Sequence, residues 1–221
     1  MNKFLNRTVG LIIIVPLIYL AVVWNKLPER IAMHFDIRGN ADQFDSKNEF
    51  LWFSLVMLVV SLGTYLLLTN IWRIDPKKYA AENKERLQKI GFALVTFLSA
   101  VECIVIYTSL KGSLKLDLRL MFALIGLFWA VIANYMNNLR PNYFAGFRLP
   151  WTLENEENWR RTHHLASKLW FVGGLLITVI CIFTTTTFSI ISIFSILTIV
   201  TVIPVVYSYR FYRKQKKSSF N

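Results

Sequence analysis

Residues 169–209 read LWFVGGLLITVICIFTTTTFSIISIFSILTIVTVIPVVYSY, a stretch of 41 residues without one charged side chain. As a single helix it would be about 60 Å long, twice the roughly 30 Å hydrocarbon core of a bilayer. The stretch is therefore expected to form two membrane-spanning helices, 169–183 and 188–209. The run of four threonines at 184–187 is the polar break that separates them.

Four earlier windows have the same character. Residues 8–25, 50–72 and 120–139 carry no Asp, Glu, Lys or Arg, and 90–110 carries only Glu102. Each window is close to the roughly 20 apolar residues that one crossing requires. The chain 1–221 is thus predicted to be one integral membrane domain, an all-α polytopic bundle of six transmembrane helices.

The composition excludes other classes of protein. Of 221 residues, 55% are apolar and 17% are charged, whereas a soluble domain carries about 25% charge. Such a chain has too much apolar surface to stay disordered, and two cysteines exclude a disulfide scaffold. The first apolar stretch is long and lacks a small-residue cleavage site, so it is interpreted as an uncleaved helix and not a signal peptide.

The basic residues predict the orientation. The loops that share a side with both termini hold 18 Lys and Arg, and the opposite loops hold 7. By the positive-inside rule both termini are expected in the cytoplasm, with the loop 26–49 outward and the loop 140–168 inward. The basic, aromatic-rich tail after Tyr209 then fits an anchor against anionic lipid and not a nucleic-acid site.

The outward loop 26–49 combines a short apolar alternation with polar residues. Ile31, Met33 and Phe35 alternate with smaller or polar residues, which predicts an extended segment, and Arg38-Gly39-Asn40 predicts a turn. The spacing of the aspartates does not match a calcium loop, so we expect a hydrogen-bonded polar cap. Its candidate residues are His34, Asp36, Gly39, Asp42, Asp45 and Lys47.

The inward loop 140–168 divides into an irregular part and a helix. Pro141, Gly146 and Pro150 break the first part, while Asn155 and the acidic residues after it fit a helix start. From there an interfacial helix is expected to run into the fifth span. One stripe of it holds Trp159, Thr162, His163, Ala166 and Trp170, and the opposite stripe, facing headgroups or a partner, holds Arg160, Arg161, His164 and Lys168.

No catalytic or metal-binding constellation is visible. His163 and His164 are adjacent, so on a helix they point about 100° apart and cannot hold one metal together. His34 is predicted on the other side of the membrane. The chain has no HExxH, P-loop or GxSxG motif, so we expect no enzyme, no cofactor and no metal.

Glu102 is the one carboxylate predicted inside a span, where an ionised group is costly. It is interpreted either as a proton relay or contact for a cationic ligand, or as an interhelical hydrogen-bonding group. For the second interpretation Asn134, also placed within a span, is the suggested partner.

Two blocks of sequence resemble one family. The inward block NYFAGFRLPWTLENEENWRRTH at 142–163 resembles the signature of the SdpI family, a group of bacterial polytopic membrane proteins. The matching positions are Asn142, Gly146, Arg148, Pro150, Trp151, Thr152, Leu153, Asn155, Trp159, Thr162 and His163. The outward block at 27–47 resembles the uncharacterised domain usually found at the N-terminus of that family, through Pro28, Ile31, His34, Phe35, Gly39, Asp42 and Lys47.

The resemblance implies a protein of the bacterial cytoplasmic membrane that gives immunity to a secreted toxic peptide. In the typical member it also implies a receptor that holds a small transcriptional repressor at the membrane. The resulting hypothesis is binding without catalysis. Asp36, Asp42 and Asp45 would meet a cationic peptide outside, and Arg148, Trp151, Trp159 and the basic face 160–168 would dock a soluble partner inside. The alternative is a small proton-linked transporter or channel that uses Glu102.

Overall fold

The computed structural model describes residues 3–77, 80–111 and 117–218. Six helices in it are long and apolar enough to cross a membrane, which confirms the predicted all-α bundle of six spans. They are α1 (Lys3–Val23), α2 (Lys47–Asn70), α3 (Lys84–Leu110), α4 (Leu118–Met136), α6 (Glu156–Phe183) and α7 (Thr186–Ser218).

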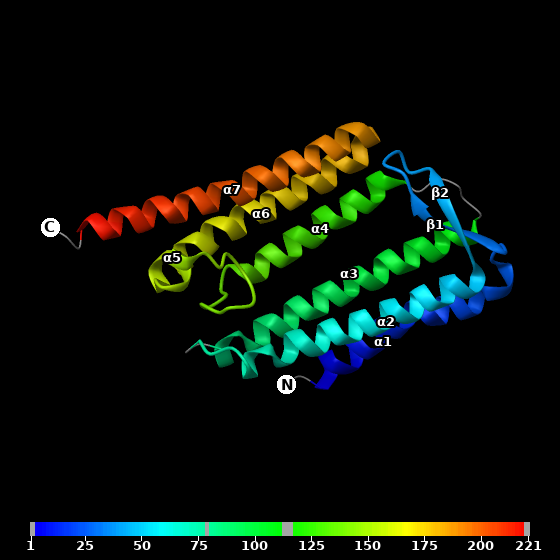
Figure 1. Cartoon of the computed structure of the whole chain (residues 1–221), viewed down its shortest axis with the longest axis horizontal. Coiled ribbons are helices and arrows are strands. Elements are labelled where there is room, and N and C mark those ends of the chain that lie inside the picture. The colour runs from blue at the N-terminus through cyan, green and yellow to red at the C-terminus, as the bar shows by residue number, and fades with distance from the viewer. Residues whose placement is uncertain (1–2, 78–79, 112–116, 219–221) are drawn as a thin grey trace.

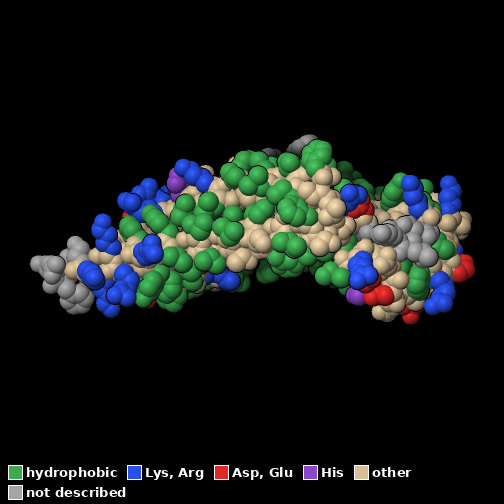
Figure 2. Space-filling view, turned by 90° about the horizontal axis from the view of Figure 1, so that it is seen from above, with side chains coloured by type: hydrophobic (Ala, Val, Ile, Leu, Met, Phe, Trp, Pro, Cys, Tyr) green, Lys and Arg blue, Asp and Glu red, His purple; other side chains and the backbone are tan. Residues whose placement is uncertain are grey.

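The remaining elements are short and lie at the two ends of the bundle (Figure 1). The hairpin end carries η1 (Trp24–Lys26), β1 (Arg30–Phe35) and β2 (Ala41–Ser46). The loop end carries η2 (Ile71–Arg73), η3 (Ala80–Asn83) and α5 (Pro150–Leu153). Figure 2 shows the corresponding surface, apolar in the middle with Lys and Arg side chains gathered toward both ends.

Two helices are longer than the apolar windows suggested. The expected interfacial helix and the fifth span form one continuous helix, α6, of 28 residues. Helix α7 has 33 residues and continues past Tyr209 into the basic tail. The break between α6 and α7 lies at Thr184 and Thr185, inside the run of threonines.

The helices form two groups, α1–α2–α3 and α4–α6–α7, which meet where α3 lies beside α4 (Figure 1). The closest packing is between α4 and α6. A Cβ added at Gly126 would lie 2.7 Å from the carbonyl oxygen of Gly174, and one added at Gly174 would lie 2.5 Å from that of Gly126. Only glycine permits this approach, because small residues let two helix backbones come together in a membrane.

Both prolines inside the spans leave a carbonyl that a neighbouring helix satisfies. Proline has no N–H, so the carbonyl four residues earlier loses its helical partner. Pro16 frees the carbonyl of Ile12, which accepts a hydrogen bond from Ser99 Oγ at 3.0 Å. Pro204 frees the carbonyl of Val200, which accepts from Trp170 Nε1 at 3.2 Å. In each group of three helices, a side chain of one helix thus donates to the carbonyl that a proline leaves unpaired in another helix.

Replacing Gly174 by alanine is expected to lower the free energy of unfolding by about 1–3 kcal/mol, because the added methyl group forces α4 and α6 apart. Gly63→Ala is the matched control, since a Cβ at Gly63 in α2 meets nothing within 4 Å. Unfolding in mixed detergent micelles measures both variants. Equal stability of the two would contradict the close α4–α6 contact.

Candidate functional site

The hairpin end is built by β1 and β2, which pair antiparallel from Arg30 opposite Ser46 to Phe35 opposite Ala41. The predicted extended segment is β1, and the predicted turn is present, with Gly39 at φ 82°. The Asp36 carboxylate accepts hydrogen bonds from the backbone N–H groups of Arg38 and Asn40, both at 2.8 Å. These bonds, chiefly the one from Asn40, lower the pKa of Asp36.

The hairpin is fixed to the helices below it by an apolar anchor and a helix cap. Ile31 of β1 is fully buried and packs with Leu20 of α1 and Phe50 of α2. Ser46 at the end of β2 caps α2, because its Oγ accepts from the Glu49 N–H while the Glu49 carboxylate accepts from the Ser46 N–H. This reciprocal capping box fixes the angle between strand and helix.

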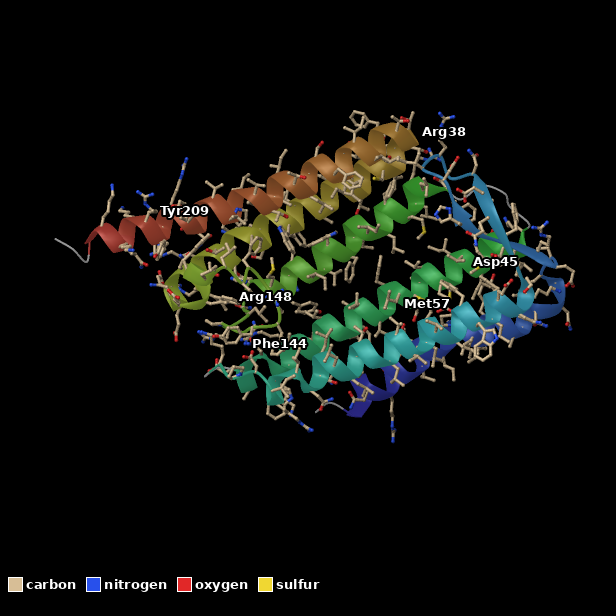
Figure 3. All side chains as sticks on the ribbon, in the orientation of Figure 1. Arg38, Asp45, Met57, Phe144, Arg148 and Tyr209 are labelled. Carbon is tan, nitrogen blue, oxygen red and sulfur yellow. The ribbon has the colours of Figure 1, made fainter. Side chains whose placement is uncertain are left out.

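The other polar residues of the hairpin differ in their partners. His34 Nδ1 lies 2.6 Å from an oxygen of Asp42, and Lys47 pairs with Glu29 at 3.1 Å. Asp45 forms none of the ion pairs or side-chain hydrogen bonds found in the described residues. Asp45 and Arg38 both lie on the hairpin, at the end of the molecule opposite the inward loop (Figure 3).

At the loop end, Asn142 organises the irregular backbone before α5. Its side chain is buried; Oδ1 accepts from the N–H groups of Phe144 and Ala145, and Nδ2 donates to the carbonyl of Arg140. Gly146 follows with φ 100°, in the left-handed region that favours glycine. A Cβ at Gly146 would also collide with the His163 ring.

Thr152 and Trp151 hold α5 against its neighbours. Thr152 is buried, and its hydroxyl donates to the Phe147 carbonyl at 2.6 Å and accepts from the Leu149 N–H at 3.0 Å. Pro150 occupies the first turn of α5, where a missing N–H costs nothing. Trp151 Nε1 donates to Ser208 Oγ of α7 at 3.0 Å, and its ring lies against Tyr209.

The first turns of α6 are tied to α4 and α7 by buried polar groups. Asn155 is the predicted N-cap and accepts from the Asn158 N–H at 2.7 Å. Asn158 in turn donates to the Ser208 carbonyl and accepts from the Thr162 hydroxyl. Trp159 Nε1 donates to the Leu139 carbonyl at 2.7 Å.

His163 joins the inward loop to α6. Its Nδ1 lies 2.8 Å from the Trp159 carbonyl, which can only accept, and its Nε2 lies 3.0 Å from the Phe147 N–H, which can only donate. One ring nitrogen therefore carries a hydrogen and the other does not, so this geometry requires the neutral imidazole. The side chain is fully buried.

The loop end also joins the two groups of helices, through residues that the sequence did not suggest. The fully buried Asn83 of η3 donates to the Arg140 carbonyl and accepts from the Arg140 N–H. Lys77 Nζ donates to the Leu153 carbonyl at 2.8 Å and lies over the ring of Tyr143. Asn83 and Asn158 are polar residues in the segments that lead into apolar windows, and this position was the signal that could have found them. The sequence does not show which residues they contact.

The predicted inward residues thus differ in how far they are exposed. Trp159, Thr162 and His163 are buried and unavailable to a partner. Trp151 and Asn155 are half-buried, while Gly146 and Pro150 lie at the surface. Within residues 143–168, the exposed aromatic, basic and histidine side chains, which we name the inward surface, are those of Tyr143, Phe144, Arg148, Arg160, Arg161, His164 and Lys168. Figure 3 shows Phe144 and Arg148 on the loop at this end.

Glu102 is buried in α3, but its suggested bond to Asn134 does not form. Asn134 is exposed on α4, whereas Glu102 is 5% exposed and its Oε1 has no hydrogen-bond partner among the described residues. The buried hydroxyl of Ser54 in α2 also makes no hydrogen bond of good geometry among the described residues. It still interacts with the Glu102 carboxylate of the neighbouring helix α3. The expectation for Asn134 was wrong because α4 turns that side chain away from the bundle.

Comparison with known proteins gives two family matches, one in the N-terminal part of the chain and one in the C-terminal part. The SdpI/YfhL protein family matches residues 138–208, which include the inward loop, α5, α6 and most of α7. A domain of unknown function, DUF1648, matches residues 11–58, which include the hairpin. The resemblance to the SdpI family is confirmed.

One curated relative extends the similarity over most of the chain. The Immunity protein SdpI of Bacillus subtilis (strain 168) is 27% identical over 182 residues, which are 81% of this chain and 84% of the relative. No solved structure gives a significant match. Together with the six apolar helices, this similarity supports a multi-pass membrane protein that is similar to the SdpI family.

Replacing His163 by phenylalanine is expected to lower the free energy of unfolding by about 1–3 kcal/mol, because the Phe147 N–H loses its buried acceptor. His164→Phe is the adjacent control, since His164 is exposed. Thermal unfolding in detergent measures stability, and protease cleavage within 140–150 reports release of the loop. Similar behaviour of both variants would show that His163 does not hold the loop.

Proposed function

We propose that the protein is an immunity protein that protects a bacterial cell from a secreted toxic peptide by binding and not by catalysis. The observation that carries this proposal is the similarity to Immunity protein SdpI, which extends over both the hairpin half and the loop half of the chain. In this function the chain lies in the cytoplasmic membrane, with both termini in the cytoplasm and the hairpin outside, as the distribution of basic residues favours.

The hairpin is the proposed contact for the peptide. Its polar residues are presented on a short sheet that Ile31 and the Ser46–Glu49 cap hold rigidly on α1 and α2. Asp36 and Asp42 already have partners within the hairpin, whereas Asp45 does not. We therefore expect a cationic peptide to contact the half-buried Asp45 and the exposed Asp42, which would release His34 and pair with the peptide instead.

The inward surface is the proposed contact for a cytoplasmic partner such as a small transcriptional repressor. Its aromatic side chains and its cations are exposed together, while the buried signature residues keep the loop in shape. Aromatic residues and arginine are the side chains that most often contribute strongly to protein interfaces. In this proposal the buried signature residues preserve the scaffold, and the exposed side chains, among them Arg148 of the signature, recognise the partner.

A survival assay tests the proposed immunity. The wild-type chain, expressed in a toxin-sensitive bacterium that lacks its own immunity protein, is expected to raise survival under toxin challenge. Asp45→Asn is expected to reduce the toxin concentration tolerated by about two- to fivefold, the effect of removing one exposed ion pair.

Glu154→Gln is the matched control, because it removes an exposed carboxylate at the loop end and is expected to leave protection unchanged. All variants are compared at equal membrane abundance. No protection by the wild type would contradict the proposed immunity, and equal protection by both variants would contradict the role of the hairpin.

A second candidate function is a small proton-linked transporter or channel, favoured by the buried Glu102 oxygen without a hydrogen-bond partner. Under this function Glu102→Gln, which cannot exchange a proton, abolishes proton-linked flux in proteoliposomes. Under the immunity function the same variant retains protection. Loss of both activities would be traced to misfolding by thermal unfolding of the purified variant.

A further inference from the structure

A groove runs between the two groups of helices, along the contact of α3 with α4. It has a volume of about 250 Å³ and an almost entirely apolar lining, which includes Ala93, Phe97, Ala100, Phe128, Val131 and Tyr135. The stacked rings of Phe97 and Phe128, 4.5 Å apart, join its two sides. Both helices are membrane spans, so the groove opens at the depth of the lipid chains.

A second and larger hollow lies at the loop end of the same two helices. This cleft has a volume of about 540 Å³, and its lining includes Arg86, Asn138, Glu156, Glu157, Trp159 and Arg160. It therefore presents guanidinium groups and carboxylates together. The cleft lies where α4 ends and where α3 and α6 begin, which is the level expected for lipid headgroups.

The groove and the cleft share one face of α3. On α3, Arg86 is followed by Ala93, Phe97 and Ala100 at intervals of seven, four and three residues. Residues at these intervals share one stripe of a helix. Arg86 is thus about 10 Å from Ala93 along the axis of α3.

On α4 the groove runs close to the end of the helix. Phe128, Val131 and Tyr135 of the groove lie on one stripe of α4, and Asn138 of the cleft follows two residues after α4 ends at Met136. The polar cleft therefore continues the apolar groove toward the loop end. A molecule that filled both would have an apolar chain in the middle of the membrane and a polar group at its surface.

The cleft is lined by three arginines, Arg86, Arg140 and Arg160, and by two carboxylates, Glu156 and Glu157, so it offers both signs of charge to a headgroup. Arg140 is already paired with Glu82. Arg86 directs Nη1 to the Glu82 carbonyl, and Arg160 directs Nε and Nη2 to Glu157, so each guanidinium retains further N–H groups. Guanidinium groups match phosphate oxygens well. Glu156 and Glu157 would repel a second negative charge on the headgroup but attract a primary ammonium group.

We propose that this seam between α3 and α4 binds one phosphatidylethanolamine molecule. An acyl chain occupies the groove, the phosphate contacts Arg86 and Arg160, and the ammonium group contacts Glu156 and Glu157. Basic pockets between membrane helices are known to recognise lipid headgroups. The lipid fills the space between the two groups of helices beside the contact of α3 with α4.

Native mass spectrometry of the detergent-purified full chain tests the proposal. The protein is titrated with phosphatidylethanolamine, phosphatidylcholine and phosphatidylglycerol that have the same acyl chains. Phosphatidylcholine has the same net charge as phosphatidylethanolamine but no N–H donor. The first phosphatidylethanolamine is expected to bind about tenfold more tightly than either other lipid, as one charge-assisted hydrogen bond allows. Equal binding of the three lipids would overturn the proposal.

Three variants locate the site. Glu156→Gln with Glu157→Gln is expected to remove the preference for phosphatidylethanolamine over phosphatidylcholine, and Ala100→Phe, which fills the groove, is expected to weaken binding of all three lipids. Arg119→Gln at the hairpin end is the control and keeps wild-type binding. Thermal unfolding identifies any variant that has lost its fold. The comparison of the three lipids uses the wild-type protein and needs no variant. Wild-type lipid preference in a folded double variant would overturn the assignment of the headgroup.

Discussion

The structure depends on the requirement that backbone polar groups inside a bilayer find partners within the protein, since an unpaired group there costs several kcal/mol. Helices meet this requirement except where a proline interrupts them. The carbonyl freed by Pro16 is paired by Ser99, and the one freed by Pro204 is paired by Trp170. These two bonds each join two helices within a group, α1 with α3 and α6 with α7.

The same need to pair backbone polar groups links the signature residues of the inward loop to the interior of the helices. The Phe147 N–H is bonded to His163, and the Phe147 ring lies 5.5 Å from that of Trp170, which pairs the carbonyl freed by Pro204. The inward loop is therefore continuous with the interior of α6 and α7. We interpret most of the signature as the residues that build this connection, which leaves recognition to the exposed side chains around them.

The sequence predicted the number of spans, the turn at Gly39 and the two stripes of α6, because apolar windows and helical spacing determine these features locally. It did not predict β2, whose residues Ala41–Ser46 are mostly polar and form a strand by pairing with β1, which Ile31 anchors. It also missed Asn83 and Asn158 and wrongly suggested Asn134 as the partner of Glu102. These contacts depend on how helices rotate against one another, which no single helix encodes.

The proposed function requires the hairpin to be the outward, recognising end of the molecule. Single cysteines introduced by Asp45→Cys and Arg148→Cys, in a Cys103→Ser/Cys181→Ser background, can be treated in intact cells with a membrane-impermeant maleimide. Position 45 is expected to be labelled in intact cells, and position 148 only after the membrane is permeabilised. Labelling of position 148 but not of position 45 in intact cells would contradict this orientation.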